Sequence, residues 1–176
     1  SKYEVDYDVV PCGKEYLSDA DIKLINYLAK HKHTSPFNHC FMTFRVKAPI
    51  FVARQLVKHK FMPWNEVSRR YVDDDPEFYV PEVWRGRPHH GNKKQGSGED
   101  LDHISMRGLT DLHKIALIEY KAYLAAGVAP EQARMVLPQS TLTEWYWSGT
   151  LGAVLDMLKL RLSPDTQKET QEVAKL

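Results

Sequence analysis

The sequence predicts an α+β fold in which an antiparallel or mixed twisted sheet is flanked by helices. Apolar residues recur with helical spacing in several segments and alternate with polar residues in two others, as in half-buried strands. Helices and strands do not alternate regularly, which argues against a parallel, doubly wound sheet. With 176 residues, of which 43% are hydrophobic, the chain is expected to form one domain over residues 1–176.

The first half of the chain predicts a helix, a strand and a second helix. Ser18 and Asp21 form a capping-box pattern at the start of a helix that reaches about residue 30 and ends in a His-rich turn. Residues 42–46 have the period of a strand. Residues 49–59 predict a helix that opens on a proline, and the polar segment after it reads as a turn.

The middle of the chain predicts an insertion and a long helix. Residues 85–102 are rich in Gly, Lys, His and Arg and nearly free of apolar side chains, which indicates a polar surface insertion within the domain. Residues 109–124 keep near-helical apolar spacing up to Gly127, as a long core helix does. A short helix carrying Arg134 follows.

The last third predicts a strand and two helices. Residues 141–147 alternate aromatic and polar side chains, and their Trp-Tyr-Trp cluster suits either an interface or a buried core. Residues 151–162 predict an apolar helix. Ser163 and Pro164 are expected to cap and open a final polar helix.

Composition excludes several partners. The net charge of +1 gives no overall field toward nucleic acid or an anionic membrane, and no apolar stretch approaches the roughly 18 residues of a membrane span. Two cysteines, Cys12 and Cys40, suit free thiols in a reducing compartment, so we expect a cytoplasmic protein, although a single bridge stays open. His31, His33 and His39 lie close together in the sequence, but no second cluster of metal-ligating residues accompanies them, so we expect no metal.

One segment carries a candidate binding site. On a helix, Gln55, Lys58 and His59 share one face, and the break before Pro63 would let Ser68 and Arg70 fold back beside them. Such a donor-rich pocket suits an anionic ligand with a planar polar ring. Spacing alone leaves a second interpretation open, a solvated basic helix face.

Four ordered blocks resemble the flavin-dependent thymidylate synthase (ThyX) family. Lys58-His59-Lys60, followed after seven residues by Ser68, resembles the family's Arg-His-Arg triplet and serine. The further matching blocks are residues 33–39, 46–55, and 133–138 together with 160–161. The resemblance runs from about residue 18 to 167 and implies a ThyX-like fold.

The resemblance also implies a reaction. In this family NADPH reduces FAD, methylenetetrahydrofolate supplies one carbon, and C5 of the uracil of dUMP is methylated without a cysteine nucleophile. Family members are homotetramers whose active sites are shared between subunits. The same assembly, with a uridine monophosphate as substrate, is the expectation for this chain.

The resemblance assigns roles by position. Arg161 corresponds to the arginine that draws uracil N3 toward its ionised form, and we count it with His59 as catalytic. The flavin-binding candidates are His33, Ser35, Asn38, Lys58, His59, Lys60, Glu66, Thr150, Gly152 and Asp156. The substrate-binding candidates are Gln55, Lys58, Glu66, Val67, Ser68, Arg69, Arg70, Arg134 and Arg161.

The sequence departs from the family pattern mainly on the flavin side. Lysines replace two arginines of the triplet, Asn38 replaces an acidic residue, and Thr150, Gly152 and Asp156 stand where many relatives place Asn, Arg and Asn against the adenine half of FAD. Two alternatives follow: a UMP or dUMP C5-methylase of specialised nucleotide biosynthesis, and a catalytically degenerate nucleotide-binding subunit.

Overall fold

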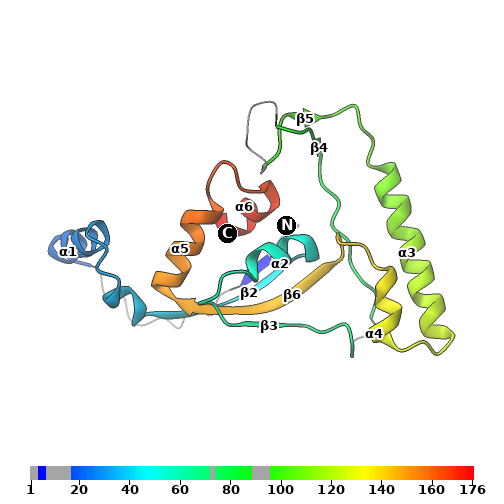
Figure 1. Cartoon of the computed structure of the whole chain (residues 1–176), viewed down its shortest axis with the longest axis horizontal. Coiled ribbons are helices and arrows are strands. Elements are labelled where there is room, and N and C mark those ends of the chain that lie inside the picture. Colours follow the sequence, from blue (N-terminus) through cyan, green and yellow to red (C-terminus); the bar gives the residue numbers. More distant parts are fainter. Residues whose placement is uncertain (1–3, 7–16, 72–73, 89–95) are drawn as a thin grey trace.

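A four-stranded antiparallel sheet forms the centre of the molecule (Figure 1). The structure is a computed structural model and describes residues 4–6, 17–71, 74–88 and 96–176. The strand order is β1-β2-β6-β3, and the strands are β1 (Glu4–Asp6), β2 (Phe41–Pro49), β6 (Leu142–Thr150) and β3 (Trp64–Glu66). Helices accompany this sheet, which confirms the predicted α+β class.

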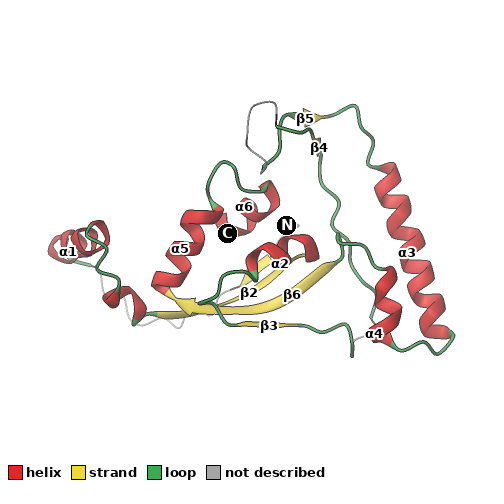
Figure 2. Cartoon of the chain, viewed as in Figure 1, coloured by secondary structure: helices red, strands yellow, loops and turns green. Residues whose placement is uncertain are grey.

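The helices form three groups around the sheet (Figures 1 and 2). One group packs together over one face of β2 and β6: α2 (Ile50–Leu56), α5 (Leu151–Arg161) and α6 (Lys168–Lys175). At one end of the molecule lie α1 (Asp19–Lys30) and η1 (Ser35–Asn38). At the other end lie α3 (Arg107–Ala125), α4 (Pro130–Ala133) and η2 (Arg134–Val136).

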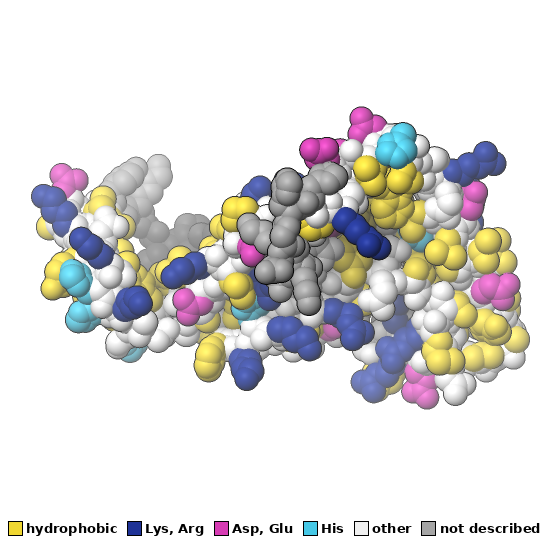
Figure 3. Space-filling model, turned by 45° about the horizontal axis from the view of Figure 1, so that its top comes forward, with side chains coloured by type: hydrophobic (Ala, Val, Ile, Leu, Met, Phe, Trp, Pro, Cys, Tyr) yellow, Lys and Arg dark blue, Asp and Glu magenta, His cyan; other side chains and the backbone are white. Residues whose placement is uncertain are grey.

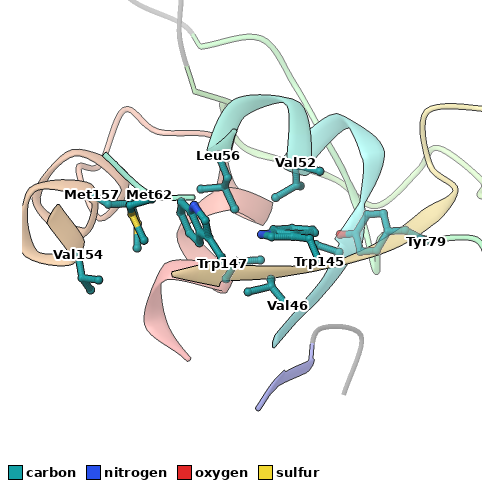
Figure 4. Packing of buried hydrophobic residues seen from close by; sticks show 12 residues of the cluster. Val46, Val52, Leu56, Met62, Tyr79, Trp145, Trp147, Val154 and Met157 are labelled. Carbon is teal, nitrogen blue, oxygen red and sulfur yellow. The ribbon is translucent and has the colours of Figure 1, made fainter. Parts of the chain in front are cut away.

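The core lies between the sheet and the helices α2, α5 and α6 (Figure 4). In the β2–β6 register Val46 lies opposite Trp145 and Phe44 lies opposite Trp147, so alternate residues of both strands face the helices. Trp64 of β3 stacks on Trp145 with ring centroids 4.2 Å apart. Burying each tryptophan removes roughly 200 Å² from water, worth about 5 kcal/mol before the entropy of ordering it.

The aromatic cluster of β6 therefore divides between the two faces of the sheet. Trp145 and Trp147 are core residues, while Tyr146 between them is 52% exposed on the opposite face. That face is otherwise polar. Arg45 donates two hydrogen bonds to Glu144, of 2.8 and 3.0 Å, and Thr43 and Ser148 share one of 2.9 Å.

Two predicted helix boundaries are confirmed by their capping contacts. The Ser18 hydroxyl accepts from Asp21 N at 3.2 Å, and the Asp21 carboxylate accepts from Ser18 N at 3.0 Å, so the capping box closes before α1. Gly127 follows α3 with φ of +83°, a left-handed conformation that other residues adopt only at a cost.

The second helix is shorter than predicted. It ends at Leu56 rather than His59, because Lys58 N and His59 N bond to carbonyls three residues back, at 3.4 and 3.1 Å, and tighten the chain into a turn. Gln55, Lys58 and His59 therefore do not share one helix face. The turn leads into β3, which has only three residues and is therefore too short to show the alternation of apolar and polar residues typical of a strand.

The final helix also starts later than predicted. Its N-cap is Gln167, not Ser163, because the Ser163 hydroxyl bonds to the side chain of Asp165 and the 163–166 segment closes a turn instead. In the long helix α3, His113, Ala116 and Tyr120 are buried, whereas Leu112 and Tyr123, predicted as core, are exposed.

The predicted insertion is anchored at its base. Its arms pair as β4 (Trp84–Arg85) and β5 (Asp100–Leu101), and residues 89–95 lie outside the described part. Arg85 donates to Ser97 at 2.7 Å and forms an ion pair with Glu169 of α6, whose side chain is almost completely buried. The insertion is thus tied to the C-terminal helix by a charge-assisted contact.

Candidate active site

The contact between His59 and Arg161 is the centre of the candidate site. His59 lies in the turn after α2 and Arg161 is the last residue of α5, 102 positions later. Arg161 Nε donates to His59 Nε2 at 2.9 Å, and a second guanidinium nitrogen donates to the Gln55 carbonyl at 3.2 Å. Since helix ends leave carbonyls without partners, the guanidinium also caps the end of α2.

The surroundings of this pair favour a neutral imidazole beside a charged guanidinium. Burial, and then the positive charge of Arg161, lower the pKa of His59. Burial also lowers the pKa of Arg161, which stays protonated because an arginine pKa starts so high. The Trp147 ring, 6.0 Å from the His59 ring between centroids, supplies part of the apolar wall.

The side chain of Gln55 points away from His59. Its amide oxygen accepts from Thr170 at 3.0 Å, and its amide nitrogen donates to Gln167, both at or near the start of α6. Beside it a cleft of about 660 Å³ extends between α2, α6 and the 79–85 segment. Only the Gln55 backbone therefore takes part in the His59 cluster.

A second cluster joins η1 to the start of α5. Thr150 caps α5 by accepting from Ala153 N at 3.2 Å, and its hydroxyl donates to Asn38 Oδ1 at 3.0 Å. A Cβ atom on Gly152 would lie 2.6 Å from the same Asn38 oxygen. Three flavin-binding candidates, Asn38, Thr150 and Gly152, are thus brought into contact.

Three substrate-binding candidates, Glu66, Ser68 and Arg70, lie along the sheet edge. The Glu66 carboxylate accepts from Thr143 at 2.6 Å and from Trp64 Nε1 at 3.2 Å. The Ser68 hydroxyl accepts from Arg70 N at 3.3 Å and Arg70 Nε at 3.2 Å.

Ser68 and Arg70 do not fold back beside His59 as predicted. Val67 N bonds to Glu144 O at 2.9 Å, so the chain continues along β6 beyond β3. In Figure 1 this continuation leads away from α5. Pairing with β6 fixes that direction, because each ladder bond carries the segment further along the edge.

The remaining candidates have fewer contacts. Arg69 pairs with Asp74 at 3.2 Å, and Arg134 donates to the Glu131 carbonyl at 3.2 Å. Arg134 lies in η2, at the far end of the molecule from α5 (Figure 1). His33, Ser35, Lys58, Lys60 and Asp156 are exposed side chains.

Sequence reasoning missed the residues of α6 that orient Gln55. The side chain of Gln167 accepts a hydrogen bond from Gln55 and donates one to Glu169 at 3.0 Å. Thr170, which donates to Gln55, is completely buried. Glu169 and Thr170 are buried although the helix reads as polar, and the sequence does not say which side of that helix is covered.

Metal ligation and thiol chemistry find no support in the described residues. No group of three His, Cys, Asp or Glu side chains there is placed to hold a metal ion. Cys40 is exposed and free, and Cys12 lies outside the described residues, as do His89 and His90. Among the helices that the structure describes, none has both the length and the apolar character needed to span a bilayer.

Comparison with known proteins identifies the family. The sequence model of the Thy1 family, described as thymidylate synthase complementing protein, matches residues 4–176. The chain belongs to this family. Among Thy1 relatives, the flavin-dependent thymidylate synthase of Thermus thermophilus is 44% identical over 155 residues, and that of Kosmotoga olearia is 40% identical over 159 residues.

The chain spans only part of these Thy1 relatives. The aligned region covers 88% of this chain and 57% of the Thermus protein, and 89% of this chain and 69% of the Kosmotoga protein. The match therefore shows the family, and both relatives contain residues beyond the region that aligns with this chain.

Solved Thy1-like structures agree with the fold. The UMP/dUMP methylase PolB from Streptomyces cacaoi, bound with 5-Br UMP, superimposes with a TM-score of 0.83 at 32% identity, over 99% of this chain and 86% of PolB. The same enzyme bound with 5-Br dUMP gives a TM-score of 0.83 at 29% identity, over 99% of this chain and 88% of PolB.

Proposed function

We propose that this chain is a flavin-dependent enzyme that methylates C5 of the uracil of dUMP. The observation that carries the proposal is the direct hydrogen bond between Arg161 and His59. The resemblance assigns the first to activation of the uracil and the second to the flavin, and activation and hydride delivery require the two groups to lie side by side. Membership of the Thy1 family and the relatives' activity support the same reaction.

Arg161 suits the role of electrostatic activator. A guanidinium stays cationic at any physiological pH, and its fork meets two ring acceptors, so it stabilises negative charge that develops on a uracil ring at N3 and the adjacent carbonyl. Because Arg161 is partly buried, water screens this interaction less than at an exposed site.

The donor set fits a flavin dinucleotide. Lys58 and Lys60 are exposed cations on either side of half-buried His59, which suits a diphosphate beside an aromatic ring. Since Asn38 Oδ1 accepts from Thr150, its amide nitrogen is left as a donor toward a ligand. When bound, FAD supplies the hydride that completes the methyl group, NADPH supplies electrons, and methylenetetrahydrofolate supplies the carbon.

We further propose that the complete site is shared between subunits of a homotetramer. Arg134, assigned to the nucleotide, lies in η2, at the other end of β6 from α5, which carries Arg161. A second copy that presents its Arg134 to this His59–Arg161 pair would complete the constellation.

UMP is the second candidate substrate. The PolB structures contain 5-Br UMP and 5-Br dUMP in the same fold, at a TM-score of 0.83 to this chain. The Thermus and Kosmotoga relatives are thymidylate synthases at higher identity, which favours dUMP as the first choice.

Release of tritium from C5-labelled nucleotide tests the proposal. The purified protein is supplied with FAD, NADPH and methylenetetrahydrofolate, and dUMP and UMP are compared side by side. We expect a yellow protein that releases label from dUMP. Arg161→Met is expected to slow release on the order of 100-fold, as loss of one donor to developing charge does.

Lys159→Met is the matched control, since it removes an exposed cation from the same helix. It is expected to keep the parent rate. A protein that binds FAD saturably and releases label from neither nucleotide contradicts the methylase proposal. Nucleotide binding without flavin uptake would instead indicate the degenerate subunit.

A further inference from the structure

The orientation of the Arg161 guanidinium depends on two fixed acceptors. One is His59 Nε2 at 2.9 Å, in the turn after α2, and the other is the Gln55 backbone carbonyl at 3.2 Å, at the end of the same helix. Of the five guanidinium N–H groups, these contacts use one on Nε and one on Nη2, and leave one on Nη2 and two on Nη1 for a ligand. The pair of acceptors thus fixes which edge of the fork is presented.

The hydrogen bond requires a neutral imidazole. The guanidinium only donates, so His59 Nε2 accepts only in the tautomer that carries its proton on Nδ1. Protonation of His59 therefore breaks this bond and places two positive charges in contact.

The groups that face His59 do not offset that repulsion. Arg161, on α5, is the charged group that contacts His59. The Trp147 ring of β6 and the Gln55 backbone of α2 are neutral. On its own loop stand the exposed cations Lys58 and Lys60. On α6, the Glu169 carboxylate is paired with Arg85 and bonded to Gln167.

We propose that His59 is a positioning residue for Arg161: its neutral imidazole holds the guanidinium in the orientation that receives the uracil, and protonation of His59 releases it. This inference rests on the proposed function for its consequence in binding and turnover. Nucleotide binding and turnover then require the neutral imidazole. They decline in acid even though neither Arg161 nor the uracil titrates there.

The first test needs no nucleotide. Nitrogen-15 NMR of the full chain reports the tautomer and the titration of the His59 ring in the parent protein and in Arg161→Met. We expect Nε2 to be unprotonated in the parent, and the pKa of His59 to rise in Arg161→Met, because both the hydrogen bond and the repulsion are removed. Equal tautomers and equal titration in the two proteins overturn the proposal.

The second test compares two replacements of His59. His59→Gln keeps an acceptor near the Nε2 position without titrating, and His59→Leu removes the acceptor. The affinity for dUMP and UMP is measured by calorimetry between pH 5.5 and 8. Because the nucleotide phosphate itself titrates near pH 6, the ratio of parent to His59→Gln affinity isolates the histidine.

We expect that ratio to fall as the pH decreases through the lowered pKa of His59, by on the order of tenfold once the imidazole is protonated, as for loss of one hydrogen bond to a charged group. His59→Leu should bind weakly at every pH, and His113→Gln, a control histidine on α3, should keep the parent profile. A His59→Leu variant with parent affinity and profile overturns the proposal. If the parent binds neither nucleotide at any pH, the proposed function fails, and the NMR comparison alone decides the role of His59.

Discussion

At the scale of single residues, Gly152 and Asn38 depend on each other. The Asn38 oxygen occupies the space above the Gly152 Cα, where a Cβ atom would lie 2.6 Å away, and it is held there by the Thr150 hydroxyl. A larger residue at 152 therefore requires Asn38 to move. This explains how Asn38 and Gly152, which both depart from the family pattern, are accommodated together.

Gly152→Ala is expected to destabilise the protein by about 1 kcal/mol, because the swung Asn38 side chain loses its hydrogen bond with Thr150. Urea unfolding of Gly152→Ala, Asn38→Ala and the double variant measures this. Both single changes remove the same hydrogen bond, that between Asn38 and Thr150. The double variant should therefore be no less stable than Gly152→Ala alone. Strictly additive losses would show that the two residues are independent.

The candidate site residues can be named from the sequence, but their contacts cannot. The triplet around His59 and the arginine at 161 stand out through the family blocks, but 102 positions separate them, and only the packing of α5 beside α2 places one on the other. Ser68 and Arg70 show the reverse case. They are near His59 in sequence, yet β-pairing carries them away along the sheet.

At the scale of elements, long periodic segments were predicted well. The α1 capping box, the alternation of β2, the extent of α3 and the Gly127 stop are local features, and local patterns determine them. The C-terminal end of α2 and the start of α6 were wrong by several residues, because tertiary contacts decide them: β3 must reach β6, and Ser163 bonds to Asp165.

Helix α3 is joined to the strand-side loops by a histidine. His113 is buried, shares a 2.7 Å hydrogen bond with Ser140, and stacks on Phe78 with ring centroids 4.6 Å apart. Burial lowers the pKa of His113 below its usual value of 6.5. The folded chain thus holds this imidazole neutral at a pH where the unfolded chain protonates it.

Stability should accordingly decrease in acid. Between the lowered pKa of folded His113 and 6.5, the unfolded state binds more protons, so the free energy of unfolding falls as the pH falls through that window, and it is unaffected above it. His59, whose pKa is also lowered, adds to the same trend. Urea unfolding between pH 8 and pH 5 measures the slope.

His113→Gln keeps a neutral partner for Ser140 and removes one titrating group. We expect it to reduce the pH dependence of stability without abolishing it. If the free energy of unfolding depends on pH equally in His113→Gln and in the parent protein, His113 does not contribute to the loss of stability in acid.

At the scale of the whole molecule, apolar surface remains uncovered at both ends. Helix α1 has no buried residue, and Leu24 and Tyr27 on it are 56% and 57% exposed. Helix α3 exposes Leu112, Ile115 and Ile118, and apolar side chains spread over this end in Figure 3. A 12-residue helix is marginal by itself in water, which favours a partner surface for α1.

We expect the protein to sediment as an assembly larger than one chain. Ile118→Lys should shift it toward smaller species, because a charge on an apolar interface is costly to bury, while Lys114→Gln on the same helix should not. Analytical ultracentrifugation at several concentrations measures both. A stable monomer with full activity would remove the idea of a shared site.

The division of the candidate site follows from the same architecture. The His59–Arg161 pair lies at the C-terminal end of α5, and Arg134 lies in η2 near the other end of β6. The sheet keeps these two groups apart within one chain, and in the proposed assembly a second copy would bring its Arg134 to the pair.

The most direct test of the account is a crystal structure of the assembled protein with FAD and dUMP bound. We expect the Arg161 guanidinium to lie within hydrogen-bond distance of the uracil while its Nε still donates to His59. We expect the flavin ring to lie against a face of the uracil ring. A uracil and a flavin in separate cavities, with Arg161 contacting neither, would contradict it.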